Sequence, residues 1–333
     1  MAAPLAISMG DPAGIGPEII AKAWQRRGER TLPPFVAIGD ARAIARVWEG
    51  PVRIVERIDD VADAFDSALP VLRVEDAGDI VPGVPDIEGA RCALYALELA
   101  AGLARSGAVS ALVTGPVSKA QLYAVGFAHP GQTEFVAERC GVAAENAAMM
   151  LAGPSLRVVP ITTHVPLSQV SSLLTVDLIL AKGRATARGL ARNFGIQAPR
   201  LAFAGVNPHA GEGGALGREE IEVIEPAIAL LRAEGIDAIG PLAADTLFHA
   251  RARKEYDAVL CPYHDQALVP LKTLHFDEGV NITLGLPIVR TSPDHGTAFG
   301  IAGRGEAHPG AMIAAIELAA EAAERRSACA PGE

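Results

Sequence analysis

Three histidines share a local sequence pattern that could hold a metal ion. His164 in VPITTHVPL, His209 in FAGVNPHAGEGG and His264 in VLCPYHDQAL each follow a short apolar run of strand-like composition. The carboxyl ends of the strands in an open parallel sheet face the ligand crevice, so three imidazoles there could converge. Imidazoles that leave a coordination position open make a catalytic metal site, which takes water or a substrate oxygen. The alternative, that each histidine caps a loop by hydrogen bonding, fits the spacing equally well.

Glycine-rich turns between strands and helices are candidate anion sites. Gly14 and Gly16 in GDPAGIGPEII offer free backbone amides at the start of a helix. A dinucleotide fingerprint would need a third glycine where the chain has Ile19, so this turn predicts no standard Rossmann site. VTGPVSKAQL repeats the strand, turn and helix pattern, with Pro116 expected to start the helix. Glycines in NPHAGEGGALG favour close backbone approach to a ligand. Tight turns needed only for packing remain the alternative for the first two.

Polar residues gather between Tyr263 and Gly300. Lys272 and Arg290 there are natural clamps for a phosphate or carboxylate, although a single such residue is more often a solvated surface charge. Asp245 in PLAADTLF either caps a helix or faces the crevice. We interpret the remaining histidines as structural or surface residues (His249, His275 and His308) or as parts of motif-like loops (His129 and His295).

The elements that must position these residues alternate between short apolar runs and longer helical patterns, which is typical of a parallel α/β sheet. The expected strands are Leu5 to Met9, Phe35 to Ile38, Ala111 to Thr114, Val158 to Thr162, Leu201 to Gly205 and Ala258 to Cys261. The expected helices are Pro17 to Gln25, Ile87 to Arg105, Val176 to Phe194, Arg218 to Glu234 and Gly310 to Arg326.

Composition excludes several classes of protein. The chain has 333 residues, of which 50% are hydrophobic, and this length favours two α/β domains or one large one. A net charge of −10 argues against a surface for nucleic acid or for anionic membranes. Four cysteines without CxxC spacing suggest neither a disulfide framework nor a thiolate zinc site, and a reducing cytoplasm fits best. We expect no exported or membrane-embedded protein, because no basic segment precedes an apolar run at the N-terminus and no span-length apolar run follows.

Nine motifs, in order, resemble the 4-hydroxythreonine-4-phosphate dehydrogenase family of vitamin B6 biosynthesis. They are GDPAGIGPE, VTGPVSKA, GQTEF, TTHVPL, NPHAGEGG, PLAADTLF, YHDQAL, GVNITLGLPIVRTSPDHGTA and AGRG. The resemblance runs along nearly the whole chain. It implies an α/β fold of two α/β/α domains with a central cleft, similar to the isocitrate and isopropylmalate dehydrogenases. We expect a discontinuous first domain (residues 1–127 and 300–333) and a second domain (residues 128–299) that carries most of the site.

The resemblance also implies roles for individual residues. His164, His209 and His264 would bind one divalent metal (Zn, Co or Mg), in sites that both subunits of a homodimer help to build. Thr133, Lys272, Asn281 and Arg290 would bind the phosphorylated substrate. His295, Gly296 and Thr297 lie in a loop similar to one that meets NAD in related dehydrogenases, and NADP stays open. Asp245 is a candidate proton acceptor.

The chain departs from the family at Gln132, because the family usually reads GHTEF with a histidine that touches the substrate. Glutamine donates and accepts hydrogen bonds but cannot become cationic, so any charge attraction to phosphate is lost there. Lys272 and Arg290 remain to neutralise a phosphate, which favours a tolerated variant over a changed substrate.

The expected reaction is NAD-dependent oxidation and decarboxylation of 4-phosphohydroxy-L-threonine to 3-amino-2-oxopropyl phosphate. One alternative is a related dehydrogenase that decarboxylates a cyclic diol carboxylate and has little need for a phosphate clamp. Another is a non-catalytic protein that binds a phosphorylated ligand, against which the three histidines argue.

Overall fold

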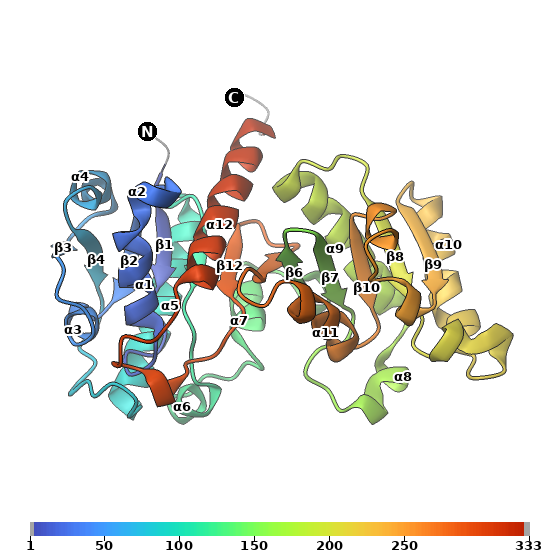
Figure 1. Cartoon of the computed structure of the whole chain (residues 1–333), viewed down its shortest axis with the longest axis horizontal. Helices are drawn as coiled ribbons and strands as arrows, with labels where there is room; N and C mark the ends of the chain where they lie inside the picture. Colours follow the sequence, from blue (N-terminus) through green and yellow to red (C-terminus); the bar gives the residue numbers. More distant parts are fainter. Residues whose placement is uncertain (1–2, 330–333) are drawn as a thin grey trace. The chain divides into compact units, whose positions relative to one another are not determined.

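The computed structural model describes residues 3–329, which form two compact units (Figure 1). Unit 1 comprises Met1–Gly141 and Pro287–Glu324, and unit 2 comprises Val142–Leu286 and Arg325–Glu333. The sequence interpretation divided the chain at 127/128 and 299/300 instead, and residues 1–2 and 330–333 of its first domain lie outside the described residues. In the structure, the segments that hold Gln132, Arg290 and His295 belong to unit 1.

The strands of unit 1 form a parallel sheet with the order β3-β4-β2-β1-β5-β12. They are β1 (Leu5–Ser8), β2 (Phe35–Gly39), β3 (Val52–Val55), β4 (Leu69–Arg73), β5 (Leu112–Thr114) and β12 (Arg290–Pro293). Its helices are α1 (Gly16–Gln25), α2 (Arg27–Arg30), α3 (Ala41–Ala45), α4 (Val61–Phe65), α5 (Ile87–Ser106), α6 (Lys119–Ala124) and α7 (Gln132–Arg139), and α12 (Gly310–Cys329) begins there. Every residue of β1, β2 and β5 is buried, as expected for central strands covered on both faces.

Local signals explain where several helices begin and end. Asp86 accepts a hydrogen bond from the Gly89 N–H at 2.7 Å and so caps the start of α5, and Gly107 ends that helix in the left-handed conformation. Pro116 does not start a helix, contrary to the sequence prediction. Ser118 caps α6, because its hydroxyl accepts from the N–H of Gln121.

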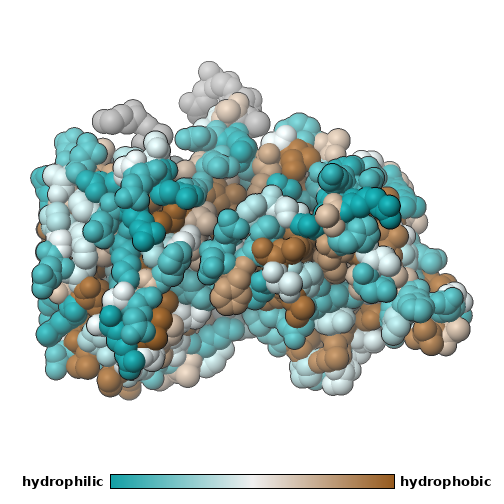
Figure 2. Space-filling view, viewed as in Figure 1, coloured by the Kyte–Doolittle hydropathy of each residue, from teal (hydrophilic) through white to brown (hydrophobic). Residues whose placement is uncertain are grey.

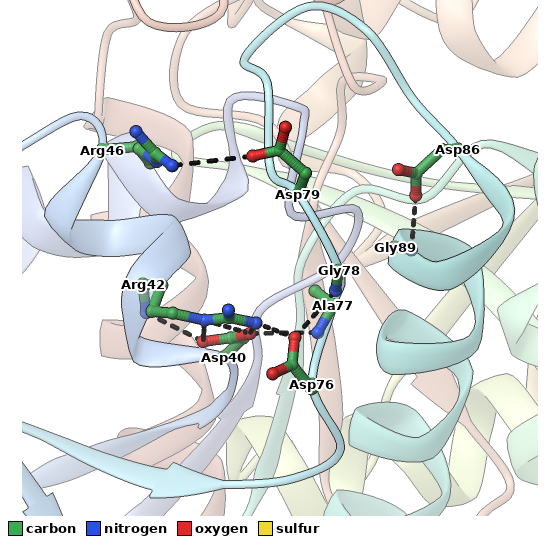
Figure 3. Close-up of polar contacts among 9 residues, drawn as sticks. All are labelled: Asp40, Arg42, Arg46, Asp76, Ala77, Gly78, Asp79, Asp86 and Gly89. Carbon is green, nitrogen blue, oxygen red and sulfur yellow. Dashed lines mark hydrogen bonds and ion pairs between the residues drawn. The ribbon is translucent and has the colours of Figure 1, made fainter.

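A group of hydrogen bonds centred on the Asp40 carboxylate lies directly after β2. The Asp40 carboxylate accepts from the Arg42 guanidinium, the Arg42 N–H and the Ala77 N–H, while Arg42 also pairs with Asp76 (Figure 3). Burial acts to raise the pKa of Asp40, but these hydrogen bonds hold it below its ordinary value. An acid at the end of the second strand is where a Rossmann domain binds the cofactor ribose. The Asp40 carboxylate instead accepts hydrogen bonds from Arg42 and Ala77 of the same chain. This agrees with the sequence prediction that the first turn, which has Ile19 where the fingerprint has glycine, forms no standard Rossmann site.

Unit 2 contains a mixed sheet with the strand order β11-β6-β7-β10-β8-β9. Strands β6 (Ala148–Gly153) and β7 (Leu156–Pro160) form an antiparallel hairpin, and β11 (Val280–Leu284) pairs antiparallel with β6. The others, β8 (Arg200–Ala204), β9 (Asp237–Leu242) and β10 (Ala258–Cys261), join β7 in parallel. The α-helices are α8 (Val170–Leu173), α9 (Val176–Phe194), α10 (Glu225–Ala233) and α11 (His264–Leu274), and a π-helical turn (Glu220–Ile224) precedes α10. The sequence predicted a parallel sheet, and in unit 2 this is correct for only part of the sheet.

Helix α11 is fixed by the core of unit 2. Its buried residues Ala267 and Leu271 pack in one apolar cluster with Val158 of β7 and Val259 of β10. Each large aliphatic side chain buried this way contributes about 1.5–3 kcal/mol relative to exposure. The first residue of α11, His264, is therefore held at the carboxyl end of β10 by the packing behind it.

The surface mixes hydrophilic and hydrophobic areas (Figure 2). Among the exposed apolar side chains of unit 2, Leu167, Val269 and Phe276 are 69%, 62% and 73% exposed. No helix in residues 3–329 is both long and apolar enough to cross a membrane.

Candidate active site

Two of the three histidines meet in unit 2. His164 follows β7 and His264 follows β10, and these strands are parallel neighbours, so both residues lie at the same edge of the sheet. Their ring centroids are 5.6 Å apart. Two imidazoles on one tetrahedral ion, with metal–nitrogen distances of about 2.0–2.1 Å, would have centroids roughly 5 Å apart. The separation of the two rings is therefore compatible with a shared metal ion.

Backbone contacts hold the two connections together. The Ile161 N–H donates to the Cys261 carbonyl at 2.8 Å. Thr162 donates to the Pro262 carbonyl twice, from its N–H at 3.2 Å and from its hydroxyl at 2.7 Å. The chain segments that carry His164 and His264 are thus tied together within three residues of each imidazole.

His209 lies apart from this pair. Its imidazole is 69% exposed, and Nδ1 contacts the Glu212 carboxylate at 3.0 Å. Within the part of the chain that the structure describes, no three His, Cys, Asp or Glu side chains are grouped to hold a metal ion. One chain in this conformation therefore assembles two of the predicted ligands.

Left-handed backbone marks two of the three histidines. His164 has a φ of 54°, and His209 begins a run of six successive residues, 209–214, that have positive φ. Such a conformation costs a residue with a side chain about 1–3 kcal/mol, and strain of this kind is concentrated at functional sites. The glycines of NPHAGEGGALG relieve part of this strain, because Gly211, Gly213 and Gly214 occupy three of the six positions.

The Glu220 carboxylate holds the start of this segment. It is buried and accepts from the N–H groups of Val206 and Asn207, both at 2.8 Å, and from the Asn207 side chain at 3.0 Å. Gly211 packs closely against it, because a Cβ there would lie 2.6 Å from Oε2 of Glu220. The close approach predicted from the glycines is thus made by a glutamate of the chain itself, and the sequence analysis did not single this residue out.

Two pockets adjoin the histidine pair. One, of about 230 Å³, is lined by Thr162, His164, Val165, Leu167, Val170, Tyr263, His264 and Asp265. The other, of about 460 Å³, lies along α11 and is lined by His264, Asp265, Leu268, Val269, Lys272 and Thr273. His264 and Asp265 border both, so a molecule in the α11 pocket would reach Lys272 and the metal-ligand candidate His264.

Arg290 is a buried cation in unit 1. Its guanidinium donates to the hydroxyls of Thr133 at 3.2 Å and Thr114 at 2.6 Å. Burial lowers its pKa to about 10, while the nearby Glu134 acts in the opposite direction. It therefore keeps its charge at neutral pH, and a buried positive charge held by hydroxyls favours an anionic ligand. The structure thus brings together Thr133 and Arg290, two of the predicted substrate contacts.

The Gln132 side chain is hydrogen-bonded to Gly115, the residue that follows Thr114 in the chain. Its Nε2 donates to the Gly115 carbonyl at 3.1 Å, which fixes the orientation of the amide because a carbonyl can only accept. Its Oε1 is buried and has no hydrogen-bond partner among the described residues. Gln132 therefore offers a free acceptor oxygen to whatever binds beside it.

The other predicted residues are placed as follows. In unit 2, Lys272 lies over Phe276 with Nζ 5.6 Å from the ring centroid, and Oδ1 of Asn281 is buried without a hydrogen-bond partner among the described residues. Asp245 is exposed in a short 3-10 turn that packs against the 208–214 segment, and Ala243 occupies the cap position, so Asp245 is not the helix cap.

The loop with His295, Gly296 and Thr297 meets the first glycine-rich turn in unit 1. The Thr297 carbonyl accepts from the Ile15 N–H at 3.0 Å, and a Cβ on Gly14 would lie 3.1 Å from that carbonyl oxygen. Nδ1 of His295 contacts the Gly296 carbonyl, whereas Nε2 is buried with no hydrogen-bond partner in the described chain. Two motifs far apart in the sequence thus form one surface at the carboxyl ends of β1 and β12.

Asp11, a buried residue at the start of the first glycine-rich turn, was not singled out from the sequence. It is 2% exposed, and burial raises the pKa of its carboxyl to about 6, although a hydrogen bond from the Ala13 N–H opposes the shift. The sequence signal that could have identified Asp11 is an acidic residue within a glycine-rich turn directly after a buried strand.

Comparisons with known proteins agree over nearly the whole chain. The family described as "Pyridoxal phosphate biosynthetic protein PdxA" matches residues 31–319. The 4-hydroxythreonine-4-phosphate dehydrogenase of Zymomonas mobilis is 57% identical over 327 residues, which cover 98% of each chain. The crystal structure of the Klebsiella pneumoniae enzyme of that name has a TM-score of 0.86 and 39% identity, and covers 97% of this chain and 98% of its own. A terephthalate 1,2-cis-dihydrodiol dehydrogenase from Burkholderia xenovorans has a TM-score of 0.66 and 32% identity, with 96% and 98% covered.

Proposed function

The chain belongs to the PdxA family of 4-hydroxythreonine-4-phosphate dehydrogenases, and we propose that it oxidises and decarboxylates 4-phosphohydroxy-L-threonine to 3-amino-2-oxopropyl phosphate. The observation that carries the proposal is the paired histidines at the sheet edge of a chain that is 57% identical to a relative named for this reaction. The dehydrogenase family implies a nicotinamide cofactor.

His164, His209 and His264 are the proposed metal ligands. Imidazole nitrogens suit zinc or cobalt better than magnesium, which prefers oxygen ligands. A divalent ion bound there would lower the pKa of the substrate hydroxyl and stabilise negative charge that develops on its oxygen. Since His209 does not join the other two within one chain, we propose that a second copy supplies the missing contact in a homodimer with shared sites. The exposed Leu167, beside the His164 pocket, is apolar surface that such a copy would cover.

Arg290, Thr133, Lys272 and Asn281 are the proposed contacts to the substrate phosphate. Arg290 supplies a guanidinium already desolvated and oriented by two hydroxyls, so little reorganisation is needed when a phosphate binds. Gln132 contributes no positive charge. We therefore assign the neutralisation of the phosphate to Arg290 and Lys272.

The cofactor surface proposed here is the one formed by His295, Gly296 and Thr297 with the Gly14 turn. NAD held there would supply the acceptor for the hydride that leaves the substrate carbon bearing the hydroxyl group, and the hydroxyl proton would pass to a base. Asp245, exposed beside the His209 segment, or an ordered water is the proposed proton acceptor. The resulting β-keto acid then loses carbon dioxide. NAD as the coenzyme and the cytoplasm as the location are family expectations.

A cyclic diol carboxylate is the alternative substrate, because the terephthalate dihydrodiol dehydrogenase is similar along nearly its full length. Purified protein with metal and NAD should release carbon dioxide and form NADH with 4-phosphohydroxy-L-threonine but not with unphosphorylated 4-hydroxythreonine. Turnover of the cyclic diol carboxylate at a higher kcat/KM would contradict the proposal.

A further inference from the structure

Two metal-ligand candidates carry the same side-chain contact. Nδ1 of His209 lies 3.0 Å from a carboxylate oxygen of Glu212, and Nδ1 of His264 lies 2.7 Å from one of Asp265. A carboxylate only accepts hydrogen bonds, so each contact requires the proton on Nδ1. In both imidazoles Nε2 is then the nitrogen left with a lone pair for a metal.

The backbone conformation of unit 2 brings His209 and Glu212 into contact. Residues 209–213 all have left-handed dihedrals, with His209 at φ 52° and Glu212 at φ 45°. In a single helical turn of either hand, side chains three residues apart lie on the same face, so this turn sets the Glu212 carboxylate beside the imidazole. The buried Glu220 carboxylate holds the start of the segment through the N–H groups of Val206 and Asn207.

We propose that Glu212 is a positioning residue that fixes His209 in the tautomer and ring orientation needed for Nε2 to bind a divalent metal. The proposal rests on the metal site of the proposed function and adds to it a residue outside the ligand set. Carboxylates that orient ligand histidines in this way typically change metal affinity by about 10–100-fold. Asp265 stands in the same relation to His264, but it follows His264 directly in the chain and lines both pockets, so Glu212 gives the cleaner test.

The test measures the affinity of the full-length protein for Zn²⁺ by competition with a chromophoric chelator, without substrate or NAD. Glu212→Ala removes the acceptor, Glu212→Gln keeps an acceptor oxygen without the charge, and Glu222→Ala is the matched control. Glu222 is as exposed as Glu212, at 59% against 61%, and pairs with Arg218 instead of a histidine. Thermal melting of each variant verifies that it is folded.

Glu212→Ala should weaken Zn²⁺ binding about 10–100-fold, Glu212→Gln should recover most of the loss, and Glu222→Ala should stay within about twofold of the unmodified chain. Equal affinities for Glu212→Ala and Glu222→Ala would overturn the positioning role. A loss beyond about a thousandfold would also overturn it, because Glu212 would then be a ligand itself. Absence of Zn²⁺ binding by the unmodified chain would instead overturn the metal site, and the inference with it.

Discussion

The imidazole rings of His164 and His264 lie side by side with their centroids 5.6 Å apart, although they belong to different strand connections. Thr162 ties the two connections together through the Pro262 carbonyl. We propose that this pair supplies two of the three histidine ligands of a metal site.

Replacement of His209 tests whether the separate histidine belongs to the metal site. His209→Ala should abolish turnover and bound metal, because the site would lose one of its ligands, while the melting temperature stays within a few degrees since the imidazole is exposed. Metal content after gel filtration and NADH formation are the measurements. His249→Ala, at an exposed histidine, is the control. Unchanged metal content in His209→Ala would remove His209 from the site.

Arg290 should govern substrate affinity. Arg290→Lys keeps a charge but replaces the planar fork that reaches Thr133 and Thr114 at once, so KM for the phosphorylated substrate should rise at least about tenfold, with a smaller effect on kcat. Initial-rate kinetics measure both constants. Arg53→Lys, at an exposed position in the same unit, should leave them unchanged. A KM within twofold of the original would exclude Arg290 as the phosphate contact.

Gln132 should make substrate binding less sensitive to pH than a histidine would. Gln132→His introduces a group that becomes cationic below a pH of about 6.5, so the ratio of its KM to that of the unmodified chain should fall as the pH is lowered from 8 toward 6. Parallel KM measurements across this range, with the stability of each protein verified at each pH, give that ratio. A constant ratio would mean that residue 132 does not approach the phosphate.

Asp11 should make the stability of the chain pH-dependent. Burial raises the pKa of its carboxyl to about 6, so the folded chain holds a proton that the unfolded chain releases near pH 4. The free energy of unfolding should therefore decrease as the pH rises through the window from about 4 to 6, by up to about 3 kcal/mol. Asp11→Asn, which keeps an acceptor for Ala13, should be more stable than the unmodified chain at pH 8 and lose that advantage at pH 4.5.

Urea unfolding at the two pH values measures this difference. Asp63→Asn, at an exposed aspartate of the same unit, is the control and should show no such change. An equal stability difference for Asp11→Asn at both pH values would contradict the raised pKa.

Sequence periodicity predicted strands β1, β2, β5, β7, β8 and β10 and most of the long helices, but not strands β3, β4, β6, β9, β11 and β12. Strand β10 and helix α9 have the predicted bounds, β1, β2, β5, α1 and α5 differ from them by one residue at one end, and β8 is displaced by one residue at both ends. These elements are apolar on the faces that pack, so the spacing of apolar residues in the sequence matches the spacing of buried residues in the structure. Strands β3 and β11 were not predicted because polar residues interrupt their apolar runs. The residue in β3 is the exposed Arg53, and the residue in β11 is the half-buried Asn281.

The sequence named the residues of the candidate site but not their arrangement. The motif order pointed to His164 and His264, and the rule that parallel strands share a carboxyl edge explains why they meet. Neither reveals that His209 stands apart, because that depends on the left-handed run that begins at His209 and on the buried Glu220 behind it. The predicted helix from Arg218 to Glu234 is confirmed as helical over residues 219–233, but its first part is a π-helical turn (Glu220–Ile224) instead of α-helix.

The most direct test of the central claim is NADH formation from 4-phosphohydroxy-L-threonine and NAD, measured after exhaustive chelation and again after a divalent metal is restored. We expect little turnover in the chelated protein and full recovery with Zn²⁺ or Co²⁺. Undiminished turnover after the metal has been removed would contradict the role of the three histidines, and no turnover with metal and NAD present would contradict the substrate.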